Sequence, residues 1–269
     1  MAVLVTGATS ALGLQTALDL AAAGLEVVLH GRHAGALASA AARVAEVSGS
    51  TPRQVTADFA VLADVRALAR RLEGPPLEGL VHCEETLEPE RGETRDFHER
   101  TWQIGHLAPF LLTHLMLPAL RAPGARVVFV APLLPDTWIR LADLEMEEDW
   151  DAWEAYARVK LADVILAVEL ARRLGGGPPT VVAFDPGYAR APPPDPVVRP
   201  TRRAVRAAAL DVIWLLTAGD VRYTSGRYYC DRREAEMAPI ARDPALGRAI
   251  YEIGCDVLDL APLPRAGPL

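Results

Sequence analysis

Short apolar runs alternate with longer helical patterns along this chain of 269 residues. The runs are apolar throughout, which is typical of strands that are buried on both faces of a sheet. The expected strands cover about residues 2–7, 26–31, 53–59, 77–83, 125–131, 180–187 and 225–230. The expected helices cover about residues 12–23, 36–47, 60–72, 95–121, 150–174 and 203–218. Because a helix follows nearly every strand, we predict an α/β fold, a single doubly wound parallel sheet of about seven strands within one domain, residues 1–269.

The composition and charge of the chain exclude several classes of protein. Hydrophobic residues make up 51% of the sequence, which is enough for a large core, and the formal net charge is −7. An acidic chain lacks the clustered basic surface of a nucleic-acid-binding protein, so no nucleic-acid partner is expected. The cysteines Cys83, Cys230 and Cys255 are far apart and odd in number, which indicates free thiols rather than disulfides or a zinc site, and no metal is expected.

The sequence predicts no membrane span and no export signal. The longest apolar run, about Leu107 to Leu120, is too short to cross a bilayer and predicts a buried helix. The first residues, MAVLVTGATS, form a strand pattern without the basic segment of a signal peptide. We therefore expect a cytoplasmic protein.

A glycine-containing turn joins the first expected strand to the first helix. It comprises Thr6, Gly7, Ala8, Thr9, Ser10, Ala11, Leu12 and Gly13. Free backbone N–H groups at the start of a helix bind the phosphates of a nucleotide, and glycines allow the close approach. The turn predicts a dinucleotide site, although a plain tight turn would have the same residues.

Arginine stands where the second expected strand ends. An acidic side chain at this place would bind the ribose hydroxyls of NAD, whereas Arg32 suits the 2′-phosphate of NADP. Asp58 and Phe59, which follow the third strand, are candidates to flank the adenine. The alternatives are a surface arginine in an arginine-rich chain and a solvated loop aspartate.

Lys160 is the only lysine of the chain, since the other 27 of the 28 basic residues are arginines. It follows Tyr156 by four residues, so the two side chains share one face of a helix. A nearby ammonium lowers the pKa of a tyrosine, which would make Tyr156 a better proton donor or acceptor near neutral pH. An ordinary pair on a helix face is the alternative interpretation.

With these motifs the chain resembles the short-chain dehydrogenase/reductases along nearly its whole length. TGATSALG resembles the family's TGxxxGxG turn, with Ala11 at the middle glycine, and Tyr156 to Lys160 match its Tyr-x-x-x-Lys motif. IGHLAPFLLT and FDPGYARAP are similar to the retinol dehydrogenase and protochlorophyllide reductase branch. The resemblance implies a Rossmann domain that binds NADP(H) and transfers hydride to or from a carbonyl carbon. It also implies catalytic roles for Tyr156 and Lys160 and cofactor contacts from His82, Cys83, Lys160, Pro186 and Gly187.

The chain departs from the family at several active-site positions. Pro132 stands at the catalytic serine, and Gly105 stands at the active-site asparagine. The segment His82-Cys83-Glu84-Glu85 replaces the family's Asn-Asn-Ala-Gly, and its carboxylates could weaken cofactor binding. Ala191 replaces a threonine. Three residues are candidates for a donor in place of the serine: Tyr188, His82 and Thr137.

Three functions are therefore compatible with the sequence. The first is an NADP(H)-dependent oxidoreductase acting on a carbonyl or alcohol of an apolar small molecule. The second is a non-redox enzyme, such as a cyclase, isomerase or dehydratase, that works through Tyr156, and the third is a non-catalytic cofactor-binding protein. The proline-rich segment 191–200, with Trp138, Trp150 and Trp153, suggests an apolar lid over the substrate. The long helices 95–121 and 150–174 suggest a homodimer or homotetramer.

Overall fold

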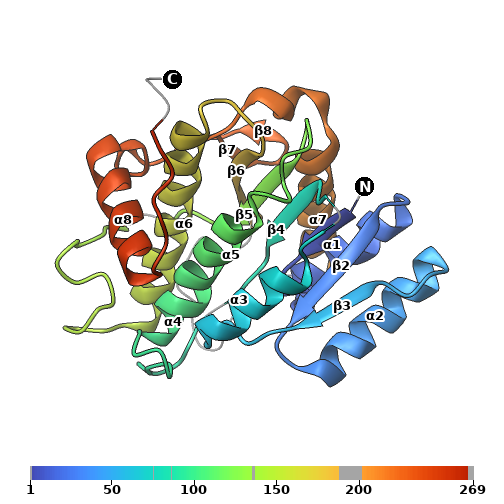
Figure 1. The fold of residues 1–269 in the computed structure, drawn as a ribbon, viewed down its shortest axis with the longest axis horizontal. Coiled ribbons are helices and arrows are strands. Elements are labelled where there is room, and N and C mark those ends of the chain that lie inside the picture. Colours follow the sequence, from blue (N-terminus) through green and yellow to red (C-terminus); the bar gives the residue numbers. More distant parts are fainter. Residues whose placement is uncertain (1, 75, 86, 135–136, 188–201, 266–269) are drawn as a thin grey trace.

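The fold was analysed in a computed structural model that describes residues 2–74, 76–85, 87–134, 137–187 and 202–265, the side chains of 202 and 203 excepted. Its centre is one twisted sheet with the strand order β3-β2-β1-β4-β5-β6-β7-β8 (Figure 1). The strands are β1 (Ala2–Val5), β2 (Glu26–Gly31), β3 (Arg53–Thr56), β4 (Gly79–His82), β5 (Arg126–Val130), β6 (Thr180–Asp185), β7 (Tyr228–Cys230) and β8 (Arg233–Glu234). This order confirms the predicted α/β class.

The first seven strands run parallel, and β8 pairs antiparallel with β7. The described part of the chain has eight strands, slightly more than the predicted number of about seven. The additional strand β8 is a two-residue return of the chain after β7, which is too short to produce a hydrophobic run in the sequence.

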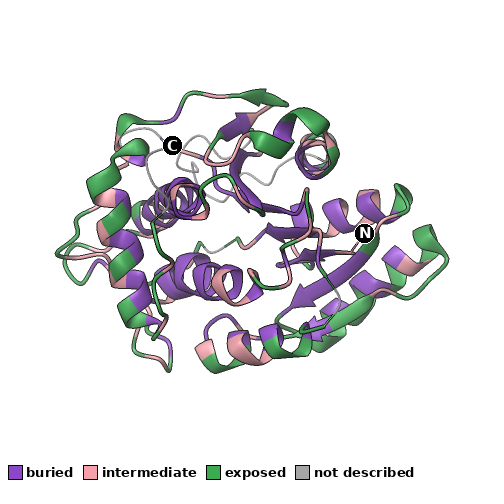
Figure 2. Cartoon of the chain, turned by 45° about the horizontal axis from the view of Figure 1, so that its top comes forward, coloured by how far each residue is buried: buried purple, intermediate pink, exposed green. Residues whose placement is uncertain are grey.

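Helices cover both faces of the sheet. The main helices are α1 (Ala11–Ala22), α2 (Ala34–Ser48), α3 (Leu62–Arg71), α4 (Arg100–Trp102), α5 (Ala108–Met116), α6 (Ala152–Leu174), α7 (Arg202–Thr217) and α8 (Pro244–Val257). α1 packs against α2 and α7 on one face, while α3, α5 and α6 lie on the other, with α8 outside α6 (Figure 1). Each face has its own apolar cluster, so the strands are buried on both sides (Figure 2).

Local sequence signals determine where α6 begins and ends. The Asp151 carboxylate accepts hydrogen bonds from the backbone N–H groups of Trp153 (2.9 Å) and Glu154 (3.0 Å), which caps the N-terminus. Gly175 ends the helix in the left-handed conformation, with φ of 58°. The helix is therefore close to the predicted range 150–174, and it positions Tyr156 and Lys160.

The predicted helix 95–121 is interrupted and starts later than expected. Residues 93–99 form a turn, closed by a bridge between Glu93 and Glu99, in which Phe97 has a φ of 65°. After α4 the chain passes through a π-helical turn, η1 (Gln103–Leu107), before α5. The apolar run that begins at Leu107 is largely buried, as expected, but the π-turn carries Gly105 at the position of the family's asparagine.

Three short or late elements were not expected from the sequence. They are the 3₁₀ helices η2 (Gly219–Tyr223) and η3 (Pro239–Arg242) and the helix α8. The packing of α8 against α6 covers the outer side of the helix that carries the predicted catalytic pair.

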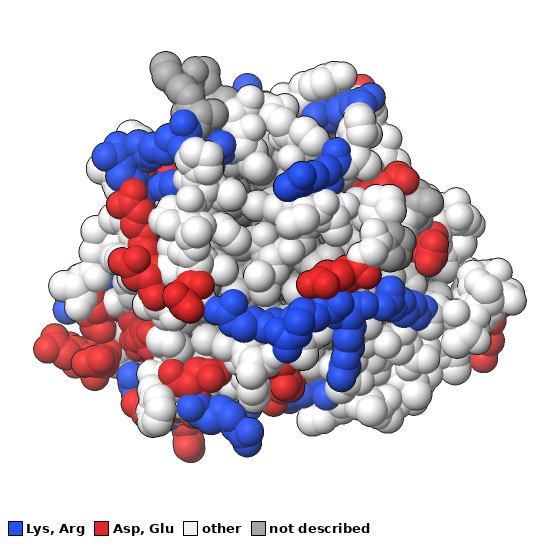
Figure 3. All heavy atoms as spheres, viewed as in Figure 1, with Lys and Arg blue, Asp and Glu red and all other residues white. Residues whose placement is uncertain are grey.

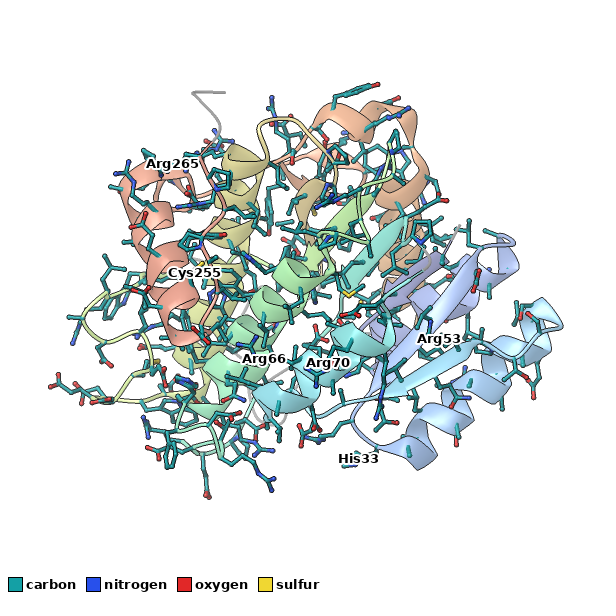
Figure 4. All side chains as sticks on the ribbon, in the orientation of Figure 1. His33, Arg53, Arg66, Arg70, Cys255 and Arg265 are labelled. Carbon is teal, nitrogen blue, oxygen red and sulfur yellow. The ribbon has the colours of Figure 1, made fainter. Side chains whose placement is uncertain are left out.

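Basic side chains form a row across the face where α3 lies (Figure 3). Arg53, Arg66 and Arg70 lie along it in the matching view of Figure 4. Arg66 donates to the backbone carbonyl of Leu258, and Arg53 donates to that of Arg71. Part of this row is thus engaged in contacts that tie α3 to neighbouring segments.

Candidate active site

The glycine turn lies at the carboxyl end of β1 and opens α1. Gly7 has a φ of 59°, and a Cβ atom on it would lie 2.6 Å from the carbonyl oxygen of Cys83. A Cβ on Gly13 would lie 2.3 Å from the carbonyl oxygen of Gly7. Ser10 caps the helix, because its hydroxyl accepts a hydrogen bond from the N–H of Gly13 (3.0 Å). Both glycines are thus required by close backbone packing, which is the geometry of a phosphate-binding turn.

A cleft of about 290 Å³ lies beside this turn. Seven of the residues proposed from the sequence line it: Gly7, Thr9, Ser10, Arg32, Asp58, Phe59 and Cys83. Arg32 is exposed, and its Nε donates to His33 Nε2 (3.1 Å). His33 lies beyond the end of β2 (Figure 4). The fold thus brings together, from the ends of β1, β2, β3 and β4, residues that are far apart in the sequence.

The predicted proton-transfer pair lies in a smaller hollow next to the cleft. Tyr156 and Lys160 line it together with Leu12, Pro132 and Pro186. The Lys160 ammonium is buried and donates to the backbone carbonyls of Glu84 (3.0 Å) and Val130 (3.1 Å). It lies 5.7 Å from the centroid of the Tyr156 ring. Cys83, Glu84 and Glu85 line both spaces, so the hollow and the cleft adjoin each other across these three residues.

The expectation that the pKa of Tyr156 is lowered is wrong in its net direction, because the pKa of this phenol is raised. Burial raises the pKa of the Tyr156 phenol above its usual value, and the carboxylates of Glu85, Asp185 and Asp163 raise it further. The ammonium of Lys160 is directed to two carbonyl oxygens rather than to the phenol oxygen. The phenol is therefore protonated at neutral pH.

The positions of the missing serine and asparagine are close to this pair. Pro132 lines the hollow, so the residue at the serine position faces the site but has no hydrogen-bonding side chain. Gly105 lies in the π-turn η1. The next residue, His106, is buried, and its Nδ1 lies 3.0 Å from Asp163 Oδ1 on α6. The His106–Asp163 contact thus ties the π-turn to α6 about one turn after Lys160.

Several predicted site residues lie outside both spaces. Thr6 is fully buried, and its hydroxyl donates to the Val81 carbonyl (3.1 Å). His82 is buried with Nε2 2.8 Å from Thr113 Oγ1, which places it behind the site. Ala11 and Gly13 belong to the first turn of α1, and the exposed Gly187 donates its N–H to Asp185 (2.7 Å).

The three candidates for a replacement donor do not receive equal support. The Thr137 hydroxyl donates to the Leu134 carbonyl (2.9 Å), and His82 is engaged by Thr113. Tyr188 and the proline-rich segment 191–200 lie outside the described residues. Of the three tryptophans, Trp153 stacks on Tyr156 with ring centroids 5.5 Å apart, whereas the Trp138 ring has the guanidinium groups of Arg140 and Arg158 each 5.1 Å from its centroid.

Sequence reasoning did not identify His30, although it lines the cleft. His30 is buried, stacks on Phe59 with ring centroids 4.4 Å apart, and has Nε2 3.1 Å from the Ala57 carbonyl. Burial lowers the pKa of its imidazole. The sequence signal that could have identified His30 is its position at the end of an expected strand, directly before Gly31.

No helix in the described part of the chain is long and apolar enough to span a membrane. No group of three histidine, cysteine or acidic side chains there is arranged to hold a metal ion.

A dinucleotide-type fold with a phosphate-binding turn and a Tyr–Lys pair beside it defines a class of oxidoreductases, and comparisons with known proteins agree. Residues 1–135 match the model of the short chain dehydrogenase family. The chain is 32% identical to retinol dehydrogenase 14 of Mus musculus over 285 residues, covering 93% of this chain and 84% of that protein. It is 34% identical to polyprenol dehydrogenase of Mus musculus over 277 residues, covering 93% and 82%.

Solved structures share the fold. A protein from Mycobacterium paratuberculosis gives a TM-score of 0.81 at 23% identity and covers 100% of this chain and 95% of its own. A short chain dehydrogenase from Shigella flexneri, solved in complex with NADP, gives 0.65 at 23% identity and covers 86% and 97%. This chain therefore belongs to the short-chain dehydrogenase family, and the predicted similarity to its retinol dehydrogenase branch is confirmed.

Proposed function

We propose that this protein is an NADP(H)-dependent oxidoreductase that reduces a carbonyl group of an apolar small molecule, with Tyr156 as the proton donor. The observation that carries the proposal is that the two spaces adjoin each other and share lining residues. The hollow with Tyr156 and Lys160 shares Cys83, Glu84 and Glu85 with the cleft of the glycine turn. A cofactor held in the cleft would thus extend toward the phenol.

The residues of the cleft fit a dinucleotide. The backbone at Gly7 and Gly13 is packed so closely that a side chain at either position would fill the turn. Ser10 and the N-terminal N–H groups of α1 would hold the pyrophosphate, and the exposed Arg32 would hold the 2′-phosphate of NADP(H). When bound, the cofactor supplies the hydride.

The chain's own residues supply the proton. A phenol whose pKa is raised stays protonated at neutral pH, so Tyr156 can donate its proton to the oxygen of the reacting carbonyl. Lys160 supports this proton transfer indirectly. Its ammonium donates hydrogen bonds to the Glu84 and Val130 carbonyls and so holds in place the backbone that borders the hollow. Its charge also favours the phenolate that remains after the transfer. Leu12, Val130, Pro132 and Pro186 give the hollow an apolar lining that suits an apolar substrate.

The experiment is the replacement Tyr156→Phe, which removes the transferable proton and keeps the ring. NADPH oxidation is followed by absorbance at 340 nm with a panel of apolar aldehydes and ketones. We expect turnover to fall by about 10²–10⁴-fold while NADPH affinity is retained. The matched control is Tyr251→Phe, because that hydroxyl is remote from the cleft and accepts a hydrogen bond from the N–H of Leu263 (3.2 Å). Full activity of Tyr156→Phe would contradict the proposal.

A second candidate is a non-redox enzyme that uses Tyr156 as its acid. Pro132 favours it, because the side chain at the serine position cannot hold a carbonyl oxygen by a hydrogen bond. Loss of one such donor typically costs about 10²–10³-fold in rate. A substrate that is converted without any change in absorbance at 340 nm would support this alternative.

A further inference from the structure

Glu84 is a buried carboxylate without a hydrogen bond. Its side chain is 8% exposed, and neither carboxylate oxygen has a hydrogen-bond partner among the described residues. It follows β4 and lines both the cofactor cleft and the Tyr156 hollow. A buried unpaired anion is costly, so its charge requires compensation from nearby groups.

Two buried imidazoles, those of His82 and His30, border the same part of the site as this carboxylate. His82 Nδ1 lies 3.7 Å from Glu84 Oε2, which is an ion-pair distance but too long for a hydrogen bond. His30 lines the same cleft from β2, and of the charges around it Glu84 raises the pKa of its imidazole most. Because the Ala57 carbonyl can only accept, His30 Nε2 carries the hydrogen of the neutral ring, and the buried Nδ1 has no partner in the described structure. His30 Nδ1 is thus free to take a proton.

The remaining charged groups around the cluster are few. Glu85 and Cys83 flank Glu84 in the chain, Asp58 lies near His30 at the end of β3, and Lys160 is bonded to the Glu84 carbonyl. Burial favours the neutral form of Glu84, but the contacts with His82, His30 and Thr6 outweigh it and lower the pKa of this carboxyl. Burial also lowers the pKa of His30. At neutral pH the cluster therefore contains an anionic Glu84 beside a neutral His30.

We propose that His30 and Glu84, with His82 beside them, form a site that takes up a proton when the cofactor binds. The inference rests on the proposed function, since it requires an anionic dinucleotide in the cleft. The phosphates would enter a cleft that Glu84 and the glycine turn line together. Added negative charge favours the protonated forms of acids and imidazoles nearby, so the proton affinity of the cluster rises on binding.

The sign of the pH dependence follows from this linkage. At a pH above the lowered pKa of His30, the cluster in the free protein does not carry the extra proton. In the complex with the cofactor, the cluster carries this proton at the same pH. Binding is therefore strongest at low pH and weakens as pH rises through the neutral range. One proton taken up corresponds to about tenfold weaker binding per pH unit.

The test measures protons rather than turnover. NADPH binding is followed by titration calorimetry at pH 7.5 in two buffers of different ionisation enthalpy, which gives the number of protons taken up. The comparison is with Glu84→Gln, which keeps the size of the side chain and removes its charge. The titration of the cofactor's own 2′-phosphate contributes equally to both proteins. We expect the parent protein to take up clearly more protons than the variant, and the variant to bind NADPH about tenfold more tightly at pH 8.5.

Glu88→Gln is the matched control. Glu88 lines the same cleft, but its carboxylate is paired with Arg100, whose Nε lies 3.3 Å away. This variant should take up as many protons as the parent. Equal proton uptake by the parent and by Glu84→Gln would overturn the inference. A loss of proton uptake in Glu88→Gln as large as the loss in Glu84→Gln would overturn it as well.

A second measurement needs no variant, in case Glu84→Gln does not fold. NADH lacks the 2′-phosphate but keeps the pyrophosphate, so saturating NADH should still cause proton uptake by the parent protein. Binding of NADH without uptake would overturn the inference and leave the proposed function intact. Absence of any binding of NADPH and NADH would overturn the proposed function, and this inference with it.

Discussion

The replacement Gly7→Ala tests whether the glycine turn is built for close approach. Two costs can be worked out from the structure. The left-handed φ of 59° costs a residue with a Cβ about 1–2 kcal/mol, and the new Cβ would lie 2.6 Å from the backbone oxygen of Cys83. Because that atom is backbone, it cannot turn away, and overpacking of this kind costs about 1–3 kcal/mol more. We expect a total loss of about 2–5 kcal/mol in the free energy of unfolding.

Gly24→Ala is the control that separates the two costs. Gly24 has a φ of 78°, but nothing lies within 4 Å of a Cβ built on it. It should cost only the conformational part, about 1–2 kcal/mol. Thermal unfolding measures both, and each kcal/mol corresponds to about 2–4 °C for a domain of this size. Equal losses for the two variants would refute the close approach between the turn and the segment after β4.

Three other predictions follow from the site and the sequence. Arg32→Ala should weaken NADPH binding by about 1.5–3 kcal/mol and leave NADH binding nearly unchanged, and calorimetry showing equal affinities for both cofactors in the parent protein would contradict the assignment. Pro132→Ser combined with Gly105→Asn should increase carbonyl reduction if the proposed function holds, whereas an unchanged rate would favour the non-redox alternative. Light scattering should give the mass of a homodimer or homotetramer, and a 29.0 kDa particle at micromolar concentration would refute this prediction. Because α8 already covers one side of α6, the subunit interface would have to use a surface other than that side.

The fold could be predicted from the sequence because each element has a strong local signal. The strands are continuous runs such as Arg126–Val130, all five of whose residues are buried. Helix ends carry caps, as at Asp151 and Gly175. The errors concern elements whose stability comes from tertiary contacts. The segment 93–99 has helix-compatible residues, but the Glu145 carboxylate, which is distant in the sequence, accepts from the N–H of Glu99 (2.7 Å) and lies 2.8 Å from His98 Nδ1. These contacts hold the segment as a turn, and the helix starts only at Arg100.

The site could be predicted where function depends on backbone geometry or on spacing. Gly7 and Gly13 are recognisable because no other residue fits, and the i to i+4 spacing of Tyr156 and Lys160 places both on one face. His30 could not be found in this way. Its role depends on which atoms surround a buried ring, and strand position alone does not give its distance from a carboxylate on another strand.

The pKa of Tyr156 is the most instructive case, because the sequence predicts its sign incorrectly. A lysine four residues away suggests that charge dominates, but the effect of burial and of three carboxylates is larger, and the ammonium is engaged by two carbonyl oxygens. A raised pKa keeps the phenol protonated throughout the neutral range, which suits reduction and opposes alcohol oxidation. We therefore expect the rate of carbonyl reduction, at saturating NADPH, to be nearly constant between pH 6 and 8. Alcohol oxidation, which needs the phenolate, should rise by about tenfold per pH unit over the same range. Oxidation that levels off near pH 7 would show that the phenol ionises at neutral pH and that spacing to Lys160, rather than burial, sets its pKa.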